Sequence, residues 1–208
     1  MIKLDRSIIK TKLQNRYKTI IDVKNHNAVL MPLFYNSNSS EWLVVFQLRS
    51  STIPTQPGEI SLPGGKIEQG ETAKQTALRE TNEELGILDH HISIWEELDQ
   101  LITPFNMSIS SFAGEIHVPL KDLKINPDEV AEVFTIPLNF FVNNPPKSYD
   151  MTVKVKPDRH FPYELVPGRE NYQFRTGNYP SYFYIYNDRV IWGFTARIIK
   201  NFIDIVFC

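Results

Sequence analysis

The chain has 208 residues, of which 42% are hydrophobic and 22% are charged, and its formal net charge is −2. This balance is typical of a globular protein with enough apolar material for a core, and it argues against a nucleic-acid-binding protein, which would carry a clear basic excess. The single cysteine, Cys208, excludes an internal disulfide and a thiolate metal site and predicts a cytoplasmic protein. No run of about 18 apolar residues is present, so we expect no membrane span.

The first fourteen residues carry scattered charges together with the apolar side chains of Ile8, Ile9 and Leu13. This pattern indicates a basic amphipathic helix and not a signal peptide. We expect the helix to cap the domain, and the alternative is docking on a membrane surface.

Two apolar segments follow, 28–35 and 42–48, and the polar turn between them predicts a β-hairpin. Pro32 within the first segment indicates an edge strand or a bulge, because proline cannot donate a ladder hydrogen bond. Residues 49–60 contain two prolines and a glycine and are predicted to be irregular.

Residues 72–85 lack glycine and proline and are rich in helix formers, and Gly86 follows where a left-handed cap would end a helix. Glu80, Glu83 and Glu84 have the spacing i, i+3, i+4, which places three carboxylates on one side of that helix. Carboxylates so close together repel one another unless a cation neutralises them.

Oxygen ligands clustered in this way suit a hard divalent cation such as Mg²⁺ or Mn²⁺. Arg79 lies one turn before Glu83 and would orient a ligand. A solvated acidic helix face is the alternative reading. The glycine pair 64–65, Glu71 and Gly86 occur at fixed spacing around the acids, which a solvated face does not require, so the metal site is the better interpretation.

The remainder of the chain predicts further strands and a long final helix. With helices at both ends and strands on either side of 72–85, an α/β fold with a mixed sheet between helical layers is expected. We see no linker or internal repeat and predict one domain over 1–208.

Residues 160–180 are expected to be irregular or short-stranded, and either shape a pocket or pack on the core. The other predicted segments are strands at 91–101 and 112–118, a short helix or strand entry at 127–136, a loop at 143–147, a hairpin at 182–192 turning at Asn187-Asp188, and a helix at 194–207.

Residues 65–87 match the pattern Gly-x5-Glu-x7-Arg-Glu-U-x-Glu-Glu-x-Gly-U, where U is a bulky aliphatic residue. The segment thereby resembles the signature of the Nudix hydrolases, with Thr81 in place of one aliphatic residue. The resemblance implies a Nudix-type α/β/α sandwich with a mixed β-sheet and helical extensions at the N- and C-terminal ends.

Residues 48–65 resemble a second motif, that of the coenzyme A pyrophosphatase subfamily, and segments 128–138 and 190–203 resemble the same subfamily. Three positions depart from this motif: Pro54 replaces an arginine, Leu62 a phenylalanine and Gln47 a threonine. The matching residues are Arg49, Ser50, Gly58 and Pro63-Gly64-Gly65.

The resemblance implies hydrolysis of a diphosphate linkage in a small nucleotide derivative. The expected substrate is coenzyme A or its thioesters, giving adenosine 3′,5′-bisphosphate and (acyl-)4′-phosphopantetheine. One to three Mg²⁺ or Mn²⁺ ions are expected. The implied metal ligands are Glu80, Glu83, Glu84 and the Gly64 carbonyl; Arg79 completes the catalytic set, and Arg49, Ser50 and Gly65 are the implied substrate-binding residues.

Several alternatives stay open. The general base is one of Glu80, Glu129 and Glu132, the last two of which are otherwise expected in a solvated turn. Arg49 either binds substrate or is a surface arginine at a strand end, and Glu71 is expected to fix the loop or Arg79. The other functional readings are hydrolysis of ADP-ribose, dinucleotides or nucleoside triphosphates, and a non-catalytic ligand-sensing module. A homodimer is a further expectation.

Overall fold

The structure is a computed structural model that describes residues 5–14, 16 and 19–207. Cys208 and the first four residues of the predicted N-terminal helix lie outside this part. The helices are α1 (Arg6–Gln14), α2 (Ala73–Leu85), α3 (Leu138–Asn143) and α4 (Gly193–Phe207), with short 3₁₀ turns at η1 (Asp89–His91), η2 (Leu120–Asp122), η3 (Tyr163–Leu165) and η4 (Arg169–Asn171). The strands are β1 (Asn25–Asn36), β2 (Glu41–Arg49), β3 (Ile60–Ser61), β4 (Gly64–Lys66), β5 (Ile92–Glu97), β6 (Leu101–Ile102), β7 (Met107–Ile116), β8 (Val130–Pro137), β9 (Lys147–Lys154), β10 (Thr176–Tyr186) and β11 (Arg189–Trp192).

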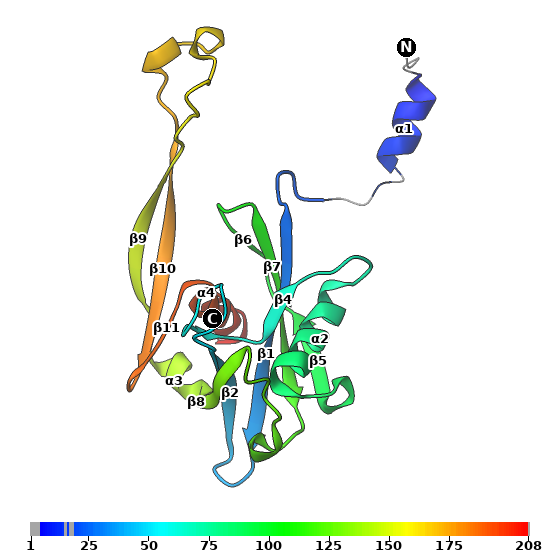
Figure 1. Ribbon diagram of the computed structural model, residues 1–208, viewed down its shortest axis with the longest axis vertical. Helices are drawn as coiled ribbons and strands as arrows, with labels where there is room; N and C mark the ends of the chain where they lie inside the picture. The colour runs from blue at the N-terminus through cyan, green and yellow to red at the C-terminus, as the bar shows by residue number, and fades with distance from the viewer. Residues whose placement is uncertain (1–4, 15, 17–18, 208) are drawn as a thin grey trace.

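Strand β1 is central in the larger of two sheets (Figure 1). The order is β3-β2-β1-β7-β5, and β4 also pairs with β1, β8 with β2 and β6 with β7. β1 and β7 are parallel, whereas the other pairs in this sheet are antiparallel. The predicted mixed sheet is confirmed.

The side chains of successive β1 residues point to opposite faces of this sheet, as the two-residue period of a strand requires. Met31 and Leu33 belong to the core cluster that contains the buried residues of α4, whereas Ala28 and Leu30 pack with Ala77 of α2. Fully burying a side chain such as Leu30 contributes roughly 1.5–3 kcal/mol. The sheet therefore lies between α2 on one face and α3 with α4 on the other, which confirms the α/β/α sandwich.

Pro32 does not mark an edge strand, so that expectation is wrong. The parallel register with β7 continues through it, from Val29 to Leu33. On the opposite side of β1, the pairing with β4 ends at Val29 and the pairing with β2 begins at Leu33. The proline thus lies where the partner strand changes, which is a position that a missing N–H tolerates.

The smaller sheet has the order β11-β10-β9. Tyr186 pairs with Arg189, so Asn187 and Asp188 form the two-residue turn of the predicted hairpin, with Asn187 at a φ of 54°. Strand β9 and the short helix α3 were not predicted. β9 and β10 form a long hairpin that projects from the domain and ends in the segment with η3 and η4 (Figure 1).

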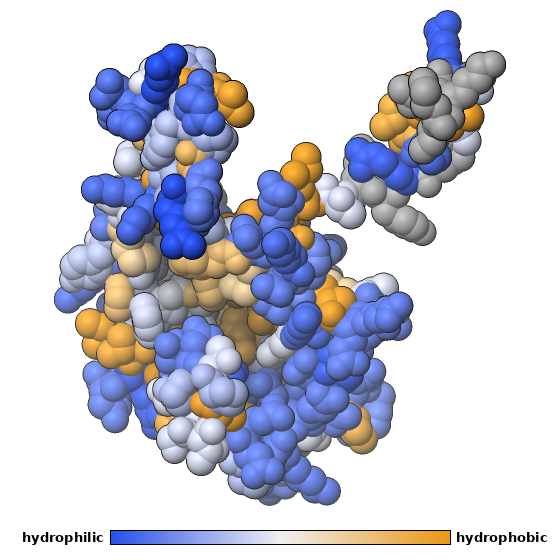
Figure 2. Space-filling view, turned by 45° about the horizontal axis from the view of Figure 1, so that its top comes forward, coloured by the Kyte–Doolittle hydropathy of each residue, from blue (hydrophilic) through white to orange (hydrophobic). Residues whose placement is uncertain are grey.

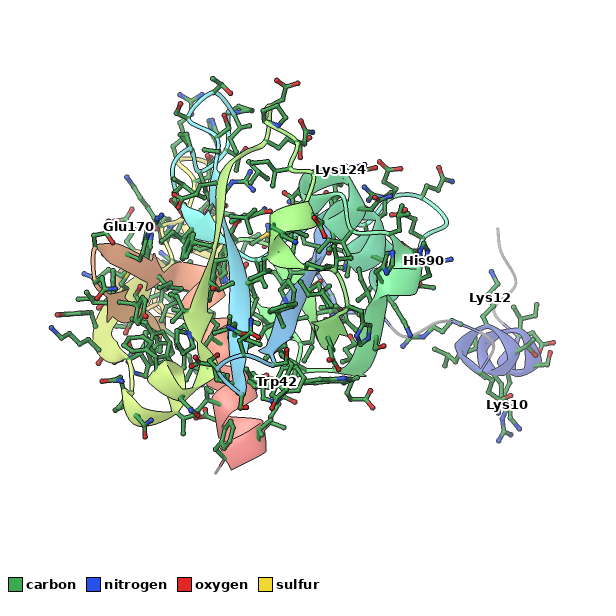
Figure 3. All side chains as sticks on the ribbon, turned by 90° about the horizontal axis from the view of Figure 1, so that it is seen from below. Lys10, Lys12, Trp42, His90, Lys124 and Glu170 are labelled. Carbon is green, nitrogen blue, oxygen red and sulfur yellow. The ribbon has the colours of Figure 1, made fainter. Side chains whose placement is uncertain are left out.

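Helix α1 forms as predicted, but none of its residues is buried. Figures 1 and 3 both show it apart from the sandwich, and Figure 3 shows Lys10 and Lys12 on its surface. The expectation that it caps the domain is therefore not met in this structure. None of the described helices is long and apolar enough to cross a membrane.

Candidate active site

Helix α2 begins and ends as its sequence predicts. Thr72 and Gln75 form a capping box, in which the Thr72 hydroxyl accepts from the Gln75 N–H and the Gln75 side chain accepts from the Thr72 N–H. Gly86 closes the helix in the left-handed region, with a φ of 69°, and its N–H donates to the Asn82 carbonyl at 2.8 Å. These caps fix the orientation of the acidic side of the helix.

Arg79 is the centre of a charge network on α2. Its Nε donates to Glu71 at 2.7 Å, and its Nη1 donates to Glu80 and to Glu83 at 2.9 Å each. Nη2 reaches the Lys66 carbonyl on β4 at 3.3 Å. The hydrogen bonds from Arg79 and from the Thr76 hydroxyl lower the pKa of Glu71 to about 2. Glu71 therefore fixes Arg79, and Arg79 orients two of the three predicted metal ligands.

Glu84 is the most deeply buried of the three acids, with 3% of its surface exposed. One of its carboxylate oxygens accepts the Gly64 N–H at 2.9 Å. Burial raises the pKa of Glu84 to about 7, because desolvation disfavours the charged form. Gln47 on β2 is fully buried and lies close enough to oppose this rise, although neither of its amide atoms has a hydrogen-bond partner in the described residues.

Burial also raises the pKa of Glu80. The hydrogen bond and charge of Arg79 oppose the rise, and the negative charges of Glu83 and Glu129 add to it. Glu129 is thus near the acids. Glu132 is instead held by Arg189 through two hydrogen bonds of 2.7 and 2.9 Å, so it lies in an ion pair and not in a solvated turn.

These acids fit a hard divalent cation by their chemistry. Glu80 and Glu84 are oxygen donors whose charge is disfavoured by burial, and a nearby cation would reverse that effect. The third acid, Glu83, is bound to Arg79 with half of its side chain exposed. Within the described residues, no three Asp, Glu, His or Cys side chains converge at ligand distance. That all three carboxylates meet at one cation therefore stays a prediction, and so does the role of the Gly64 carbonyl.

A bend at Pro63 leads into Gly64 and Gly65 of β4, and we call this segment the glycine turn. Its two glycines are required for different reasons. A Cβ on Gly64 would collide with the Ala28 carbonyl and with Val29 of β1. A Cβ on Gly65 would occupy the place of the Glu80 carboxylate. Gly64 thus allows two strands to approach, and Gly65 makes room for an acid of the site.

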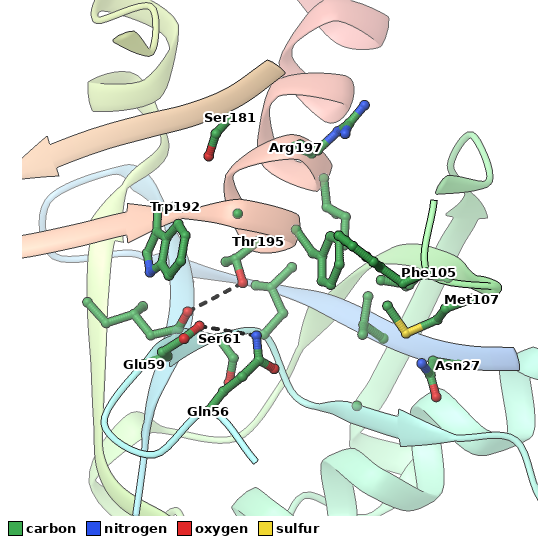
Figure 4. A pocket seen from close by; sticks show the side chains of 18 of the residues that line it. Asn27, Gln56, Glu59, Ser61, Phe105, Met107, Ser181, Trp192, Thr195 and Arg197 are labelled. Atoms are coloured by element: carbon green, nitrogen blue, oxygen red, sulfur yellow. Dashed lines mark hydrogen bonds between the residues drawn. The ribbon is translucent and has the colours of Figure 1, made fainter. Parts of the chain in front are cut away.

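A cavity of about 610 Å³ opens beside this turn. The space-filling view shows an apolar hollow between the projecting hairpin and the sandwich (Figure 2). Figure 4 shows its lining, which comes from the turn, from the β6–β7 connection, from β10 and from α4. Its lining includes Arg49, Gly64, Gly65, Phe105, Tyr179 and Arg197.

Two of the three predicted substrate residues, Arg49 and Gly65, line this cavity. Arg49 donates through Nε and Nη2 to the Thr55 carbonyl at 3.3 and 3.2 Å, which holds its guanidinium at the cavity wall. Ser50 lies outside the lining, and its hydroxyl bonds the Thr52 hydroxyl at 2.8 Å. Its substrate role stays a prediction.

Sequence reasoning offered part of the far wall of the cavity as one of two alternatives and missed Arg197. Tyr179 and Pro180, within the segment 160–180, line it, and so does Arg197 of α4. Of the two alternatives for residues 160–180, shaping a pocket or packing on the core, the first holds for the end of the segment, because Tyr179 and Pro180 line the cavity. Arg197 lies in segment 190–203, whose resemblance to the coenzyme A pyrophosphatase subfamily singled out no site residue, and no spacing in the sequence connects it to the glycine turn.

Residues 24–151 match the NUDIX domain. The chain belongs to the Nudix family. Nudix hydrolases act on small nucleotide substrates and generally use divalent metal ions, which agrees with the donor set described above.

Relatives and solved structures support this assignment. The chain is 28% identical to Nudix hydrolase 3 of Caenorhabditis elegans, over 86% of this chain and 72% of that protein. It is 30% identical to the peroxisomal coenzyme A diphosphatase NUDT7 of Mus musculus over 64% of this chain, and 29% identical to the mitochondrial coenzyme A diphosphatase NUDT8 of Homo sapiens over 82%. The matched regions span 55% and 65% of those two proteins. A MutT/nudix family protein from Enterococcus faecalis has the same fold, with a TM-score of 0.54 and 17% identity over 98% of this chain and 70% of that one.

Proposed function

We propose that the protein hydrolyses the diphosphate linkage of coenzyme A or its thioesters, with Mg²⁺ or Mn²⁺. Water is added across the P–O–P bond, and the products are adenosine 3′,5′-bisphosphate and (acyl-)4′-phosphopantetheine. The observation that carries the proposal is the position of the Arg79-bound acids behind a glycine turn that borders a large, mainly apolar cavity. The names of the mouse and human relatives support the choice of substrate.

When bound, a divalent cation supplies charge neutralisation at the phosphate oxygens and a water of lowered pKa. Glu80 and Glu84 are the side chains proposed to hold it, since burial disfavours the charged form of both and a cation would offset that cost. Arg79 keeps Glu80 and Glu83 oriented, and the Gly64 N–H keeps one oxygen of Glu84 in place. Arg49, at the cavity wall, is the guanidinium proposed to meet the diphosphate oxygens.

The size and lining of the cavity agree with such a substrate. Its volume of about 610 Å³ falls within the range of ligand pockets, and apolar side chains such as Phe105, Met107 and Phe194 surround it. Coenzyme A combines a charged nucleotide with a long, nearly neutral pantetheine arm. The apolar cavity would surround the pantetheine arm, and the proposed cation site beside it would bind the charged diphosphate.

The test is a substrate panel. Coenzyme A, ADP-ribose, NADH and nucleoside triphosphates are incubated with the protein and with Mg²⁺ or Mn²⁺, and the products are separated by chromatography. We expect adenosine 3′,5′-bisphosphate to form fastest, from coenzyme A. Faster turnover of another member of the panel would refute the substrate, and turnover of none would favour a ligand-sensing module.

A further inference from the structure

Arg197 lines the same cavity as the glycine turn but comes from α4, far away in the sequence. Its guanidinium carbon lies 4.3 Å from the centroid of the Tyr179 ring on β10. Stacking of this kind fixes the plane of the guanidinium without using its N–H donors. The arginine is thus oriented by one neighbour while its hydrogen-bonding capacity stays free.

Two polar atoms of this pair lack partners. Arg197 Nη1 and Tyr179 Oη are both buried, and neither has a hydrogen-bond partner within the described residues. A buried donor without an acceptor is costly, and the cost is larger for a charged group. Both atoms are donors that a single anionic acceptor would satisfy.

Within the cavity lining, the end at Arg197 has a cation and no carboxylate, whereas Asp99 and Asp204 line a neighbouring hollow together with Arg197. Arg49, the other guanidinium at the wall, donates to the Thr55 carbonyl and is proposed above for the diphosphate, so it is not the group for a second phosphate. Glu59, the carboxylate at the wall, would repel an anion, and Figure 4 shows it on the opposite side of the cavity from Arg197. Pro54 stands where the related motif has an arginine, so the loop near Arg49 lacks a second cation.

We propose that Arg197 and Tyr179 form a subsite for a phosphate monoester of the substrate, separate from the scissile diphosphate. The guanidinium fork matches two phosphate oxygens, and the tyrosine hydroxyl donates to one of them. In coenzyme A this group is the 3′-phosphate, so the inference rests on the proposed function.

The direct test compares the binding of adenosine 3′,5′-bisphosphate and 5′-AMP by calorimetry in the full chain. The wild type is expected to bind the bisphosphate more tightly. Arg197→Met should weaken bisphosphate binding by roughly tenfold to a hundredfold, the value of hydrogen bonds to a charged group, and leave AMP binding unchanged. The subsite would be overturned if the wild type bound the two nucleotides equally well. It would also be overturned if Arg197→Met still preferred the bisphosphate.

Lys200→Met is the matched control, because it removes a positive charge from the same helix without touching the cavity lining. Lys200 is paired with Asp204 at 2.6 Å. The control should keep the wild-type preference, and an equal loss in both variants would show a long-range charge effect and overturn the proposal. Should Arg197→Met fail to fold, Tyr179→Phe tests the same subsite by removing one hydroxyl, with a loss confined to the bisphosphate.

Kinetics separate this inference from the proposed function. With coenzyme A and 3′-dephospho-coenzyme A as substrates, Arg197→Met should raise KM for the first and not for the second. Hydrolysis of both at equal efficiency by the wild type would keep the diphosphatase activity and refute the subsite. If the wild type did not hydrolyse coenzyme A but still preferred the bisphosphate, and Arg197→Met removed that preference, the activity would be refuted and the subsite would stand.

Discussion

Gly64 and Gly65 are neighbours on β4, but an added methyl group would meet different atoms at each. At Gly64 it would meet the backbone of Ala28 and Val29, and the φ of 155° also disfavours a side chain. At Gly65 it would meet the end of the flexible Glu80 side chain. The same substitution should therefore damage the fold at one position and the chemistry at the other.

We predict that Gly64→Ala lowers the free energy of unfolding by about 2 kcal/mol or more, because β1 and β4 must separate. Gly65→Ala should change it by less than about 1 kcal/mol but should lower activity and metal affinity, because Glu80 is displaced. Denaturant unfolding and Mn²⁺ titration measure the two effects. Full activity in Gly65→Ala would contradict the role given to Glu80.

The raised pKa of Glu84 predicts a pH dependence of stability in metal-free protein. The pKa is about 7 in the folded state and 4.5 in the unfolded state, so the folded state binds the proton more tightly. This contribution is fully present below about pH 4.5 and is lost as pH rises through 7. It amounts to about 3 kcal/mol at most, at 1.36 kcal/mol per pKa unit.

Chelator-treated wild type and Glu84→Gln are unfolded with denaturant at pH values from 5 to 8. Because glutamine does not titrate, the variant should gain stability relative to the wild type as pH rises. Parallel profiles for the two proteins would show that Glu84 does not titrate in this range.

At the scale of the elements, Arg79 joins α2 to the loop that precedes it and to β4. Arg79→Met leaves Glu71, Glu80 and Glu83 without their shared cation. We expect metal affinity or activity to fall by about tenfold to a hundredfold, as for other residues that orient metal ligands. Since a quarter of the Arg79 side chain is exposed, the loss of stability should be only about 2 kcal/mol.

Arg189→Met is the matched control for Arg79→Met. It also breaks a two-bond pair with a glutamate, Glu132, but that pair joins β11 to β8 and lies outside the Arg79 network. We expect a loss of about 1 kcal/mol in stability and unchanged metal affinity. If both variants lost metal affinity equally, the network around Arg79 would have no special role in orienting the acids.

Elements with strong local signals were predictable from the sequence. The helix at 72–85 and the turn at Asn187-Asp188 depend on caps and on residues that accept positive φ, and both are local properties. Strand β9 was missed although Tyr149, Met151 and Val153 alternate with polar residues in it; nearly all of its residues are exposed, so this alternation does not show what the strand packs on. The expected packing of α1 failed for a related reason, because an amphipathic pattern shows that a helix has an apolar side but not what covers it.

For the whole molecule, the sequence predicted the acidic wall of the site and missed Arg197 in the opposite wall. The acids, Arg79 and the glycine pair lie within one segment, so their spacing carried the information. The cavity needs that segment together with β10 and α4, and the pairing of β10 with β9 and β11 is what positions Tyr179. The subfamily resemblance of segment 190–203 indicated kinship, but it could not show that Arg197 reaches the cavity. The single domain over 1–208, the cytoplasmic location and the homodimer stay predictions.

The most direct test of the account follows coenzyme A hydrolysis by wild type and by Glu84→Gln, each with Mg²⁺ or Mn²⁺ and with chelator. The wild type with metal is expected to release adenosine 3′,5′-bisphosphate and 4′-phosphopantetheine. Chelator or the Glu84→Gln substitution should nearly abolish this release while the protein stays folded. Full activity in the variant or in chelator would contradict the metal mechanism, and an inactive wild type would contradict the proposed substrate.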